Sequence, residues 1–351
     1  MKKIFLSMIA LATIMVSCSD DQTANTNVEE QGADMSDFYL YTENTEKAAG
    51  GCFTMQKLNA QLDKDADLYS RMYDIEKKYR ERSIAKKPGN GNGNGNGGGG
   101  NGGGGGGGTP PPTDNLGVVS IPVYIHVVYS NNNENISDAQ INSQMAVLND
   151  DFRRANNDAN QTPSTFAGVA ADTEIQFTLA GVFRHSNSRT SWGTNDAVKG
   201  SYPPVTPSTH LNMWVCNIGG GILGYAQFPG GNSATDGVVM SPQYFGTTGY
   251  VAAPFDGGRT TTHEVGHYLN LRHIWGDGRC NRDDFVSDTP TSDRPNYGCP
   301  SFPTTHCRST DMTMNYMDYT DDACMNMFTD GQKSRMRGVL IPGGARESLV
   351  N

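Results

Sequence analysis

Two histidines and one glutamate near residue 265 have the types and the spacing of a catalytic metal site. His263 and His267 are four residues apart, so on a helix their imidazoles lie on one face, one turn apart, and reach the same ion. Glu264 follows His263 directly, and its carboxylate can face a bound water without being a ligand itself. Thr261 or Thr262 can cap this helix. The pattern predicts zinc chemistry with a carboxylate as general base.

A third histidine extends this pattern. His273 follows His267 by six residues, and an unbroken helix would carry it away from the other two. The chain must therefore turn back before residue 272, and Asn270 stands where a left-handed residue is needed. Three imidazoles with one open position are typical of catalytic zinc, which activates water and polarises a carbonyl. Glu264 is predicted to take the water proton and pass it to the leaving amine.

The stretch from His263 to His273 resembles HExxHxxGxxH, the signature of the metzincin peptidases, except that Asn270 replaces its glycine. The run NYMDYTDDACMNMFT, which begins at residue 315, resembles the methionine turn and its continuation in the pappalysin family of metzincins. The resemblance implies that Met317 lies beneath the three imidazoles. It also implies that Tyr319 stabilises the transition state or helps to organise the zinc site. Without the upstream motif, Met317 would indicate only a core residue.

The resemblance covers most of residues 116–340 and implies an α+β fold of the metzincin type. An upper subdomain would carry a twisted mixed sheet and two long helices, the second bearing the histidines, and a smaller irregular lower subdomain would hold the methionine turn. The residues themselves predict a strand over 118–129 and an amphipathic helix over 137–154, capped by Ser137. Residues 219–229 resemble the family's edge strand, which binds extended peptides. A hairpin without a substrate role is the alternative.

The resemblance also implies a specificity pocket. In pappalysins a buried acid below this pocket favours a basic residue just after the cut bond, and Asp322 stands at the matching place. We therefore expect cleavage before arginine or lysine. A solvated loop acid is the alternative, since Asp321 lies beside it.

The acidic run at residues 280–290 resembles the family's calcium loop, and hard oxygen ligands suit Ca²⁺. The expected ligands are Asp284 and Thr289, with Asp283 and Asp288 as further candidates, and an acidic loop without metal is the alternative. Four clustered cysteines in an exported protein indicate two disulfides, for which the sequence alone allows three pairings. The resemblance implies the pairs Cys280–Cys307 and Cys299–Cys324.

A tract of glycine and asparagine in residues 88–115 divides the chain and predicts a flexible linker. Residues 116–351 are long enough for an independent core and are expected to be the catalytic domain. In the preceding segment, residues 19–87, Cys52 comes before a polar, helix-prone stretch at 56–82, which resembles pappalysin pro-segments. Its thiolate can take the fourth zinc position and keep the precursor latent. A free cysteine without a switch role is the alternative.

Residues 1–18 predict an export signal, because two lysines precede an apolar run that is short for a membrane span. Residues 15–18 resemble a lipobox, so a lipid at Cys18 is expected to hold the protein at the outer membrane or cell surface. A plain secretory signal is the alternative. Self-cleavage in the basic run at 77–87 would release the catalytic domain. This lipid is the single membrane contact that the sequence predicts.

The formal net charge of -10 disfavours a nucleic-acid partner. The main prediction is a monomeric zinc endopeptidase that acts on proteins or peptides and is made as a latent precursor. Two alternatives remain. A different zinc hydrolase is disfavoured by the methionine turn and the edge strand. An inactive surface protein that binds peptides or polysaccharide is disfavoured by Glu264, because a binder needs no general base.

Overall fold

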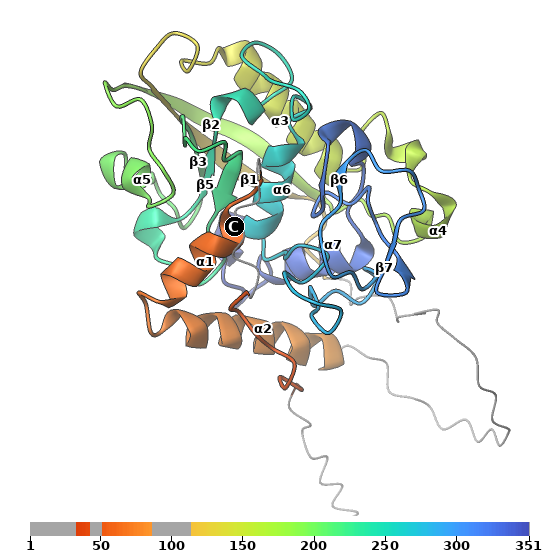
Figure 1. Ribbon diagram of the computed structural model, residues 1–351. Coiled ribbons are helices and arrows are strands. Elements are labelled where there is room, and N and C mark those ends of the chain that lie inside the picture. The colour runs from red at the N-terminus through yellow and green to blue at the C-terminus, as the bar shows by residue number, and fades with distance from the viewer. Residues whose placement is uncertain (1–32, 43–50, 86–113, 351) are drawn as a thin grey trace, which may run out of the picture. The chain divides into compact units, whose positions relative to one another are not determined.

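The computed structural model describes residues 33–42, 51–85 and 114–350 (Figure 1). The predicted export signal with Cys18, and residues 88–113 of the predicted linker, lie outside the described residues. In the described part of the chain, no helix combines the length and the apolar character that a membrane span requires.

One mixed sheet of five strands forms the centre of the larger subdomain, in the order β2-β1-β3-β5-β4 (Figure 1). Its strands are β1 (Val119–Tyr129), β2 (Ile175–Ser186), β3 (Leu211–Val215), β4 (Gly224–Ala226) and β5 (Val238–Met240). All neighbours pair in parallel except β4, which runs antiparallel to β5 at the edge of the sheet. The long inner strand β1, between β2 and β3, is almost continuously apolar, as expected for a parallel strand covered on both faces. The sheet therefore contains the predicted strand and the predicted edge.

Two helices, α3 (Asp138–Phe152) and α6 (Arg259–Tyr268), pack against each other and against the sheet. The predicted cap of α3 is confirmed, because the Ser137 hydroxyl accepts a hydrogen bond of 3.1 Å from the Gln140 amide. The apolar face of α3 is buried in the main core as its period indicates; it consists of Ile141, Met145, Leu148 and Phe152. α6 carries the first two histidines of the motif and thus holds them against the core.

The chain after α6 is irregular and forms the smaller subdomain. Its short strands are β6 (Tyr297–Gly298), β7 (Thr305–His306), β8 (Ser309–Thr310) and β9 (Tyr319–Thr320), followed by helix α7 (Asp330–Gly338). Two disulfides, Cys280–Cys307 and Cys299–Cys324, cross-link this region. They confirm the pairing expected from the family resemblance. The remaining short helices of the described chain are α4 (Ser164–Ala167), α5 (Ala197–Ser201) and the 3₁₀ turns η1 (Ala159–Gln161), η2 (Ser233–Thr235), η3 (Pro242–Tyr244), η4 (Asp322–Cys324) and η5 (Glu347–Leu349).

The segment before the linker folds into two helices, α1 (Thr54–Leu62) and α2 (Leu68–Ala85). The sequence predicts one helix-prone stretch here, and the structure divides it at residues 63–67. The two helices share a small apolar cluster, to which Phe228 of the catalytic domain contributes; its other members are Leu40, Met55, Leu58, Leu62, Leu68 and Met72. Because part of this cluster comes from the catalytic domain, the segment is packed onto that domain by apolar burial.

Candidate active site

The three motif histidines meet at one point. His267 Nε2 lies 3.1 Å from His263 Nε2 and 3.2 Å from His273 Nε2. All three imidazoles are buried. The structure therefore brings together the three histidines that the sequence singles out.

The turn after α6 makes this meeting possible. Asn270 has a φ of 81°, in the left-handed region, so the predicted reversal of the chain at this residue is confirmed. The Leu271 amide donates to the Gly266 carbonyl at 2.9 Å, a bond that spans the left-handed residue as in a Schellman motif. The helix ends there, and His273 is carried back towards the two histidines on α6.

Each imidazole is fixed through its other nitrogen. The Nδ1 atoms of the first, second and third histidine contact the Tyr316 carbonyl at 2.7 Å, the Leu271 carbonyl at 2.8 Å and Asp277 Oδ1 at 2.6 Å. Carbonyl and carboxylate oxygens only accept hydrogen bonds, so the Nδ1 atoms carry the protons. The three Nε2 atoms then face one another.

This donor set fits a cation. Burial lowers the pKa of His263 to about 3 and the pKa of His267 well below its ordinary value, so both rings stay neutral. Neutral imidazoles with bare lone pairs repel at this separation unless a positive ion lies between them. The observed spacing is close to the roughly 3.3 Å expected between ligands of a tetrahedral zinc with bonds of about 2.0–2.1 Å. The residues present can therefore hold zinc and leave a fourth position.

Glu264 lies beside this cluster and is fully buried. Burial raises the pKa of Glu264 to about 7, although hydrogen bonds from Thr54 and Cys52 act in the opposite direction. The edge strand approaches it closely, because a Cβ on Gly224 of β4 would lie 3.0 Å from Glu264 Cγ. A carboxylate with this pKa changes its protonation state near neutral pH, as a general base requires.

Met317 is completely buried under α6. A Cβ added to Gly266, between the two helical histidines, would lie 2.5 Å from Met317 Sδ. The glycine inside the motif therefore lets the methionine sulfur lie directly against the helix. Tyr319 packs its ring 4.8 Å from that of His273 and 5.7 Å from that of His263. The methionine turn thus lies against the three histidines, as the resemblance implies.

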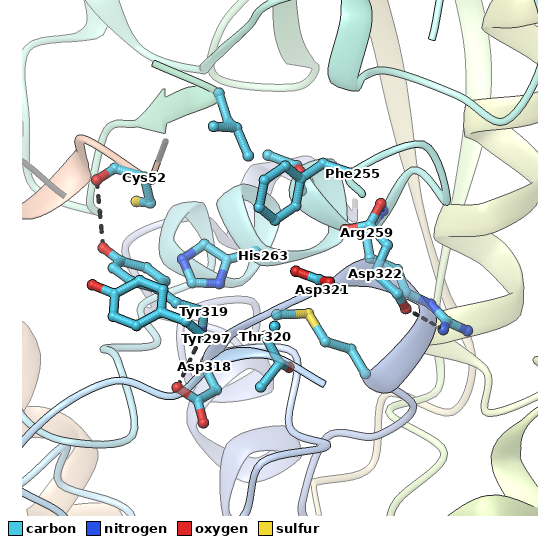
Figure 2. Close-up of a pocket in the computed structure, with 15 residues that line it drawn as sticks. Cys52, Phe255, Arg259, His263, Tyr297, Asp318, Tyr319, Thr320, Asp321 and Asp322 are labelled. Atoms are coloured by element: carbon cyan, nitrogen blue, oxygen red, sulfur yellow. Dashed lines mark hydrogen bonds between the residues drawn. The ribbon is translucent and has the colours of Figure 1, made fainter. Parts of the chain in front are cut away.

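The pro-segment enters the cleft with the residues Cys52 to Thr54. The Cys52 sulfur lies within 4.8 Å of the Nε2 atoms of all three histidines. The Phe53 amide donates to the Gly224 carbonyl at 3.0 Å, and Cys52 pairs with Gly224 in parallel. Burial and the nearby Glu264 carboxylate raise the pKa of Cys52 well above its ordinary value. Figure 2 shows its carbonyl joined to the Tyr319 hydroxyl, at 3.4 Å.

Thr54 was not singled out in the sequence, yet it makes the shortest contact of the pro-segment with the motif glutamate. Its hydroxyl donates to Glu264 Oε2 at 2.6 Å and accepts from the Ala226 amide at 2.7 Å. A threonine at the start of a polar helix has no sequence signature beyond capping, so only its position in the fold could reveal this role.

A pocket of about 240 Å³ opens beside the cluster (Figure 2). Cys52, His263 and Tyr319 line one part of it, and Arg259 and Asp322 line another. Asp322 is 3% exposed, so the alternative of a solvated loop acid does not hold for it. Burial raises the pKa of Asp322 to about 7, although its Oδ2 atom accepts bonds from the Arg259 and Gly257 amides.

The comparisons with known proteins agree with this geometry. A family model described as pregnancy-associated plasma protein-A matches residues 208–341. An extracellular metalloprotease of Arthroderma benhamiae is 31% identical over 225 residues, which cover 62% of this chain and 76% of the relative. Extracellular metalloprotease 1 of Coccidioides posadasii is 36% identical over 233 residues, covering 62% and 75%. The chain belongs to the pappalysin family of metzincin peptidases.

Two solved structures extend this result to the fold. Mature mirolysin of Tannerella forsythia, in complex with a cleaved peptide, matches with a TM-score of 0.65 and 48% identity over 68% of this chain and 97% of that one. A promirolysin mutant matches with a TM-score of 0.71 and 38% identity over 86% and 97%. This pappalysin is therefore a zinc metalloendopeptidase with the predicted metzincin fold. The names of its relatives agree with the predicted export.

The predicted calcium loop of this pappalysin is only partly assembled around one point. Both carboxylate oxygens of the buried Asp284 accept from the Thr289 hydroxyl, at 2.8 and 2.9 Å. Asp283 turns to the Phe285 amide at 2.8 Å. Asp288 accepts from the Thr329 hydroxyl and the Gly331 amide, at the start of α7. The structure thus brings Asp284 and Thr289 together and directs the Asp288 carboxylate to α7.

Two further acids of this pappalysin support the histidines and were missed in the sequence. Asp277 bonds to the third histidine, and Asp151 on α3 bonds to residues around the first. Asp277 follows His273 by four residues, which is a weak signal that depends on the turn. Asp151 lies more than a hundred residues away in the chain, so no local pattern marks it.

Proposed function

We propose that His263, His267 and His273 hold the catalytic zinc and that Glu264 is the general base for hydrolysis of peptide bonds. One observation carries this proposal: three Nε2 lone pairs converge at 3.1–3.2 Å while each Nδ1 is occupied by an acceptor. When bound, zinc polarises the scissile carbonyl and lowers the pKa of the attacking water. A different zinc hydrolase finds no support in the geometry.

Glu264 and Tyr319 have complementary roles in this proposal. The carboxylate receives the proton of the attacking water and gives it to the leaving amine. Tyr319 keeps a neutral hydroxyl, because burial raises its pKa well above the ordinary value. In the latent form this hydroxyl is directed to the Cys52 carbonyl. Once the pro-segment has left, it is free to donate to a carbonyl oxygen of the substrate.

The experiment is a protein digest by the activated enzyme, with and without a zinc chelator. Replacing Glu264→Ala should lower kcat by about 10²–10⁴-fold, the usual contribution of a positioned general base. Zinc added back should restore the wild-type enzyme after chelation but leave the variant inactive. A wild-type enzyme that keeps its activity after complete loss of zinc would refute the proposal.

We propose further that the chain is made as a zymogen whose segment before the linker blocks the cleft, through residues 51–54. Cys52 supplies a sulfur at the fourth position of the metal site, and Thr54 holds the oxygen of the base. β4 is the edge strand of the sheet and pairs antiparallel with β5. On its open side, Gly224 of β4 pairs in parallel with Cys52 of the pro-segment. This occupies the hydrogen-bonding groups that an extended peptide substrate would use. The similarity to a promirolysin mutant supports this proposal.

Asp322 is proposed to select a basic residue just after the cut bond. It is a buried acid in the lining of the same pocket as His263. Because the pKa of Asp322 is about 7, the negative charge of its carboxylate grows as pH rises from 6 to 8. Preference for lysine or arginine should increase over the same range in a peptide library. Asp322→Ala should remove both the preference and its pH dependence, and an unchanged profile would exclude Asp322.

The remaining features concern stability and location. We propose that Asp284 and Thr289 bind a structural Ca²⁺, because a buried acid beside a hydroxyl offers hard oxygen ligands. Thermal unfolding with calcium or a chelator tests this, and Asp284→Asn should abolish any difference. A lipid at Cys18 and cleavage in residues 77–87 are proposed for anchoring and release. Mass spectrometry of the mature N-terminus and metabolic lipid labelling test these two steps.

A further inference from the structure

A buried carboxylate on α3 joins the elements that surround the first histidine. Asp151 is 3% exposed. Its Oδ2 atom accepts from the Thr262 hydroxyl at 2.8 Å, and its Oδ1 atom accepts from the Tyr316 hydroxyl at 2.7 Å. Thr262 and Tyr316 are themselves fully buried. One side chain thus connects α3, α6 and the methionine turn.

Both partners of Asp151 are connected to His263, one through the backbone and one through a hydrogen bond. Thr262 precedes His263 on α6. Tyr316 provides the carbonyl that accepts from His263 Nδ1 at 2.7 Å. The Tyr316 ring also packs against the Phe328 ring, and the two ring centroids lie 4.8 Å apart. A shift of the Asp151 carboxylate would therefore move the backbone before the histidine and the acceptor that orients its ring.

The charge of Asp151 is balanced inside the same network. The Arg259 guanidinium lies 3.5 Å from Asp151 Oδ1 and bonds to Asp158 at 2.6 and 2.7 Å. Arg259 also donates to the Asp322 carbonyl at 2.8 Å, and its amide bonds to the Asp322 carboxylate. The network that holds His263 therefore continues to the acid of the specificity pocket.

We propose that Asp151 is a positioning residue of this peptidase, which sets the orientation of His263 through Thr262 and Tyr316. The proposal rests on the assignment of His263 as a zinc ligand. Residues that orient a metal ligand through one hydrogen bond typically change metal affinity or activity by about 10–100-fold when they are replaced. Asp151 reaches His263 by two routes, through Thr262, which precedes it on α6, and through Tyr316, whose carbonyl contacts its Nδ1 atom.

The test uses Thr262→Val and Tyr316→Phe in the full chain, each of which removes one hydroxyl with little change in shape. Zinc dissociation is measured by competition with a chromogenic chelator, and kcat and KM are measured after activation. Each variant should bind zinc roughly 10-fold more weakly and lose kcat with little change in KM. Asp151→Asn keeps only one acceptor oxygen, so it should lose more zinc affinity and more kcat than either of these variants. Thr262→Ser should recover most of the loss of Thr262→Val.

A matched control separates positioning from general destabilisation. Thr173 is also fully buried, and its hydroxyl donates to the Phe152 carbonyl at 2.6 Å, a contact that involves none of the three histidines. Thr173→Val should lower the melting temperature without changing zinc affinity. Zinc affinities of Thr262→Val and Tyr316→Phe within about twofold of wild type would overturn the positioning role alone. A wild-type chain that binds no zinc would overturn the metal assignment and this proposal with it.

Discussion

Among the contacts between the pro-segment and the catalytic domain, two work by different physics. In the cleft, Cys52 and Thr54 approach the histidines and Glu264, and they act on the chemistry directly. On α2, Glu76 forms a buried ion pair with Arg335 of α7, at 2.7 Å. In the proposed zymogen, the first contact blocks the site and the second holds the blocking residues in place. The difference teaches that inhibition and docking are separable and can be broken independently.

The Glu76–Arg335 ion pair is also connected to the metal site by a hydrogen bond. Arg335 also donates to the carbonyl of Asn270 at 2.8 Å, the left-handed residue that returns His273 to the metal site. Both side chains of the Glu76–Arg335 pair are 3% exposed. A buried pair of this kind is costly to break from one side, because the remaining charge stays in a poorly solvated place.

Removing the docking carboxylate should have the largest effect on the stability of the precursor. Glu76→Ala leaves Arg335 buried without its carboxylate, which costs about 3–5 kcal/mol. The melting temperature of the precursor should fall by roughly 10 °C, as differential scanning calorimetry can measure. The matched control is Glu81→Ala on the same helix, whose pair with Lys77 is exposed. A precursor as stable as the Glu81→Ala control would show that the Glu76–Arg335 pair does not hold α2 on the catalytic domain.

Removing the thiol should have the next largest effect, and it should appear in activity rather than in stability. If four ligands share the 10–16 kcal/mol of a zinc site equally, one contributes about 3 kcal/mol, or roughly 100-fold. Cys52→Ser should therefore raise the activity of the uncleaved precursor about 100-fold against a small peptide. Cys216→Ala removes the other free thiol of the described chain and should leave the precursor latent. Equal latency of both variants would exclude the cysteine switch.

Removing the hydroxyl that holds the base should have a smaller effect of the same kind. A hydrogen bond to a charged group contributes about 1.5–3 kcal/mol, so Thr54→Val should raise precursor activity by roughly 10–100-fold. Thr54→Ser keeps the hydroxyl and should remain close to wild type. The double variant with Cys52→Ser shows whether the two contacts add. If Thr54→Val does not raise the activity of the precursor, the Cys52 sulfur alone accounts for the inhibition.

Acid should weaken the docking contact by the smallest amount. Burial alone would raise the pKa of Glu76, but the charges and hydrogen bonds of Arg335 and Arg80 outweigh it and lower the pKa below 4.5. A depressed folded-state pKa contributes stability that is present above pH 4.5 and is lost as pH falls through the lowered value. Precursor stability should decline more steeply below pH 4.5 in wild type than in Glu76→Gln. Identical slopes would contradict a charged Glu76.

The catalytic motif could be read from the sequence because its geometry is local. His263 and His267 are one helical turn apart, and Asn270 supplies the reversal that the third histidine needs. The strand at 118–129 and the capped helix that follows were predictable for the same reason, since each has its own short-range period or cap. The disulfide pairing and the place of Met317 followed from the family resemblance, because spacing alone left alternatives open.

By itself, the sequence predicted which residues would hold a metal and placed a cysteine before a helix-prone stretch. Only the tertiary structure decided which residues support them. Thr54, Asp151 and Glu76 act on partners that lie between 111 and 259 residues away in the chain. Contacts of this length leave no periodic or spacing signal, because chain folding alone brings the partners together. The tertiary structure also decided that Asp322 is buried, because burial depends on which elements cover a residue.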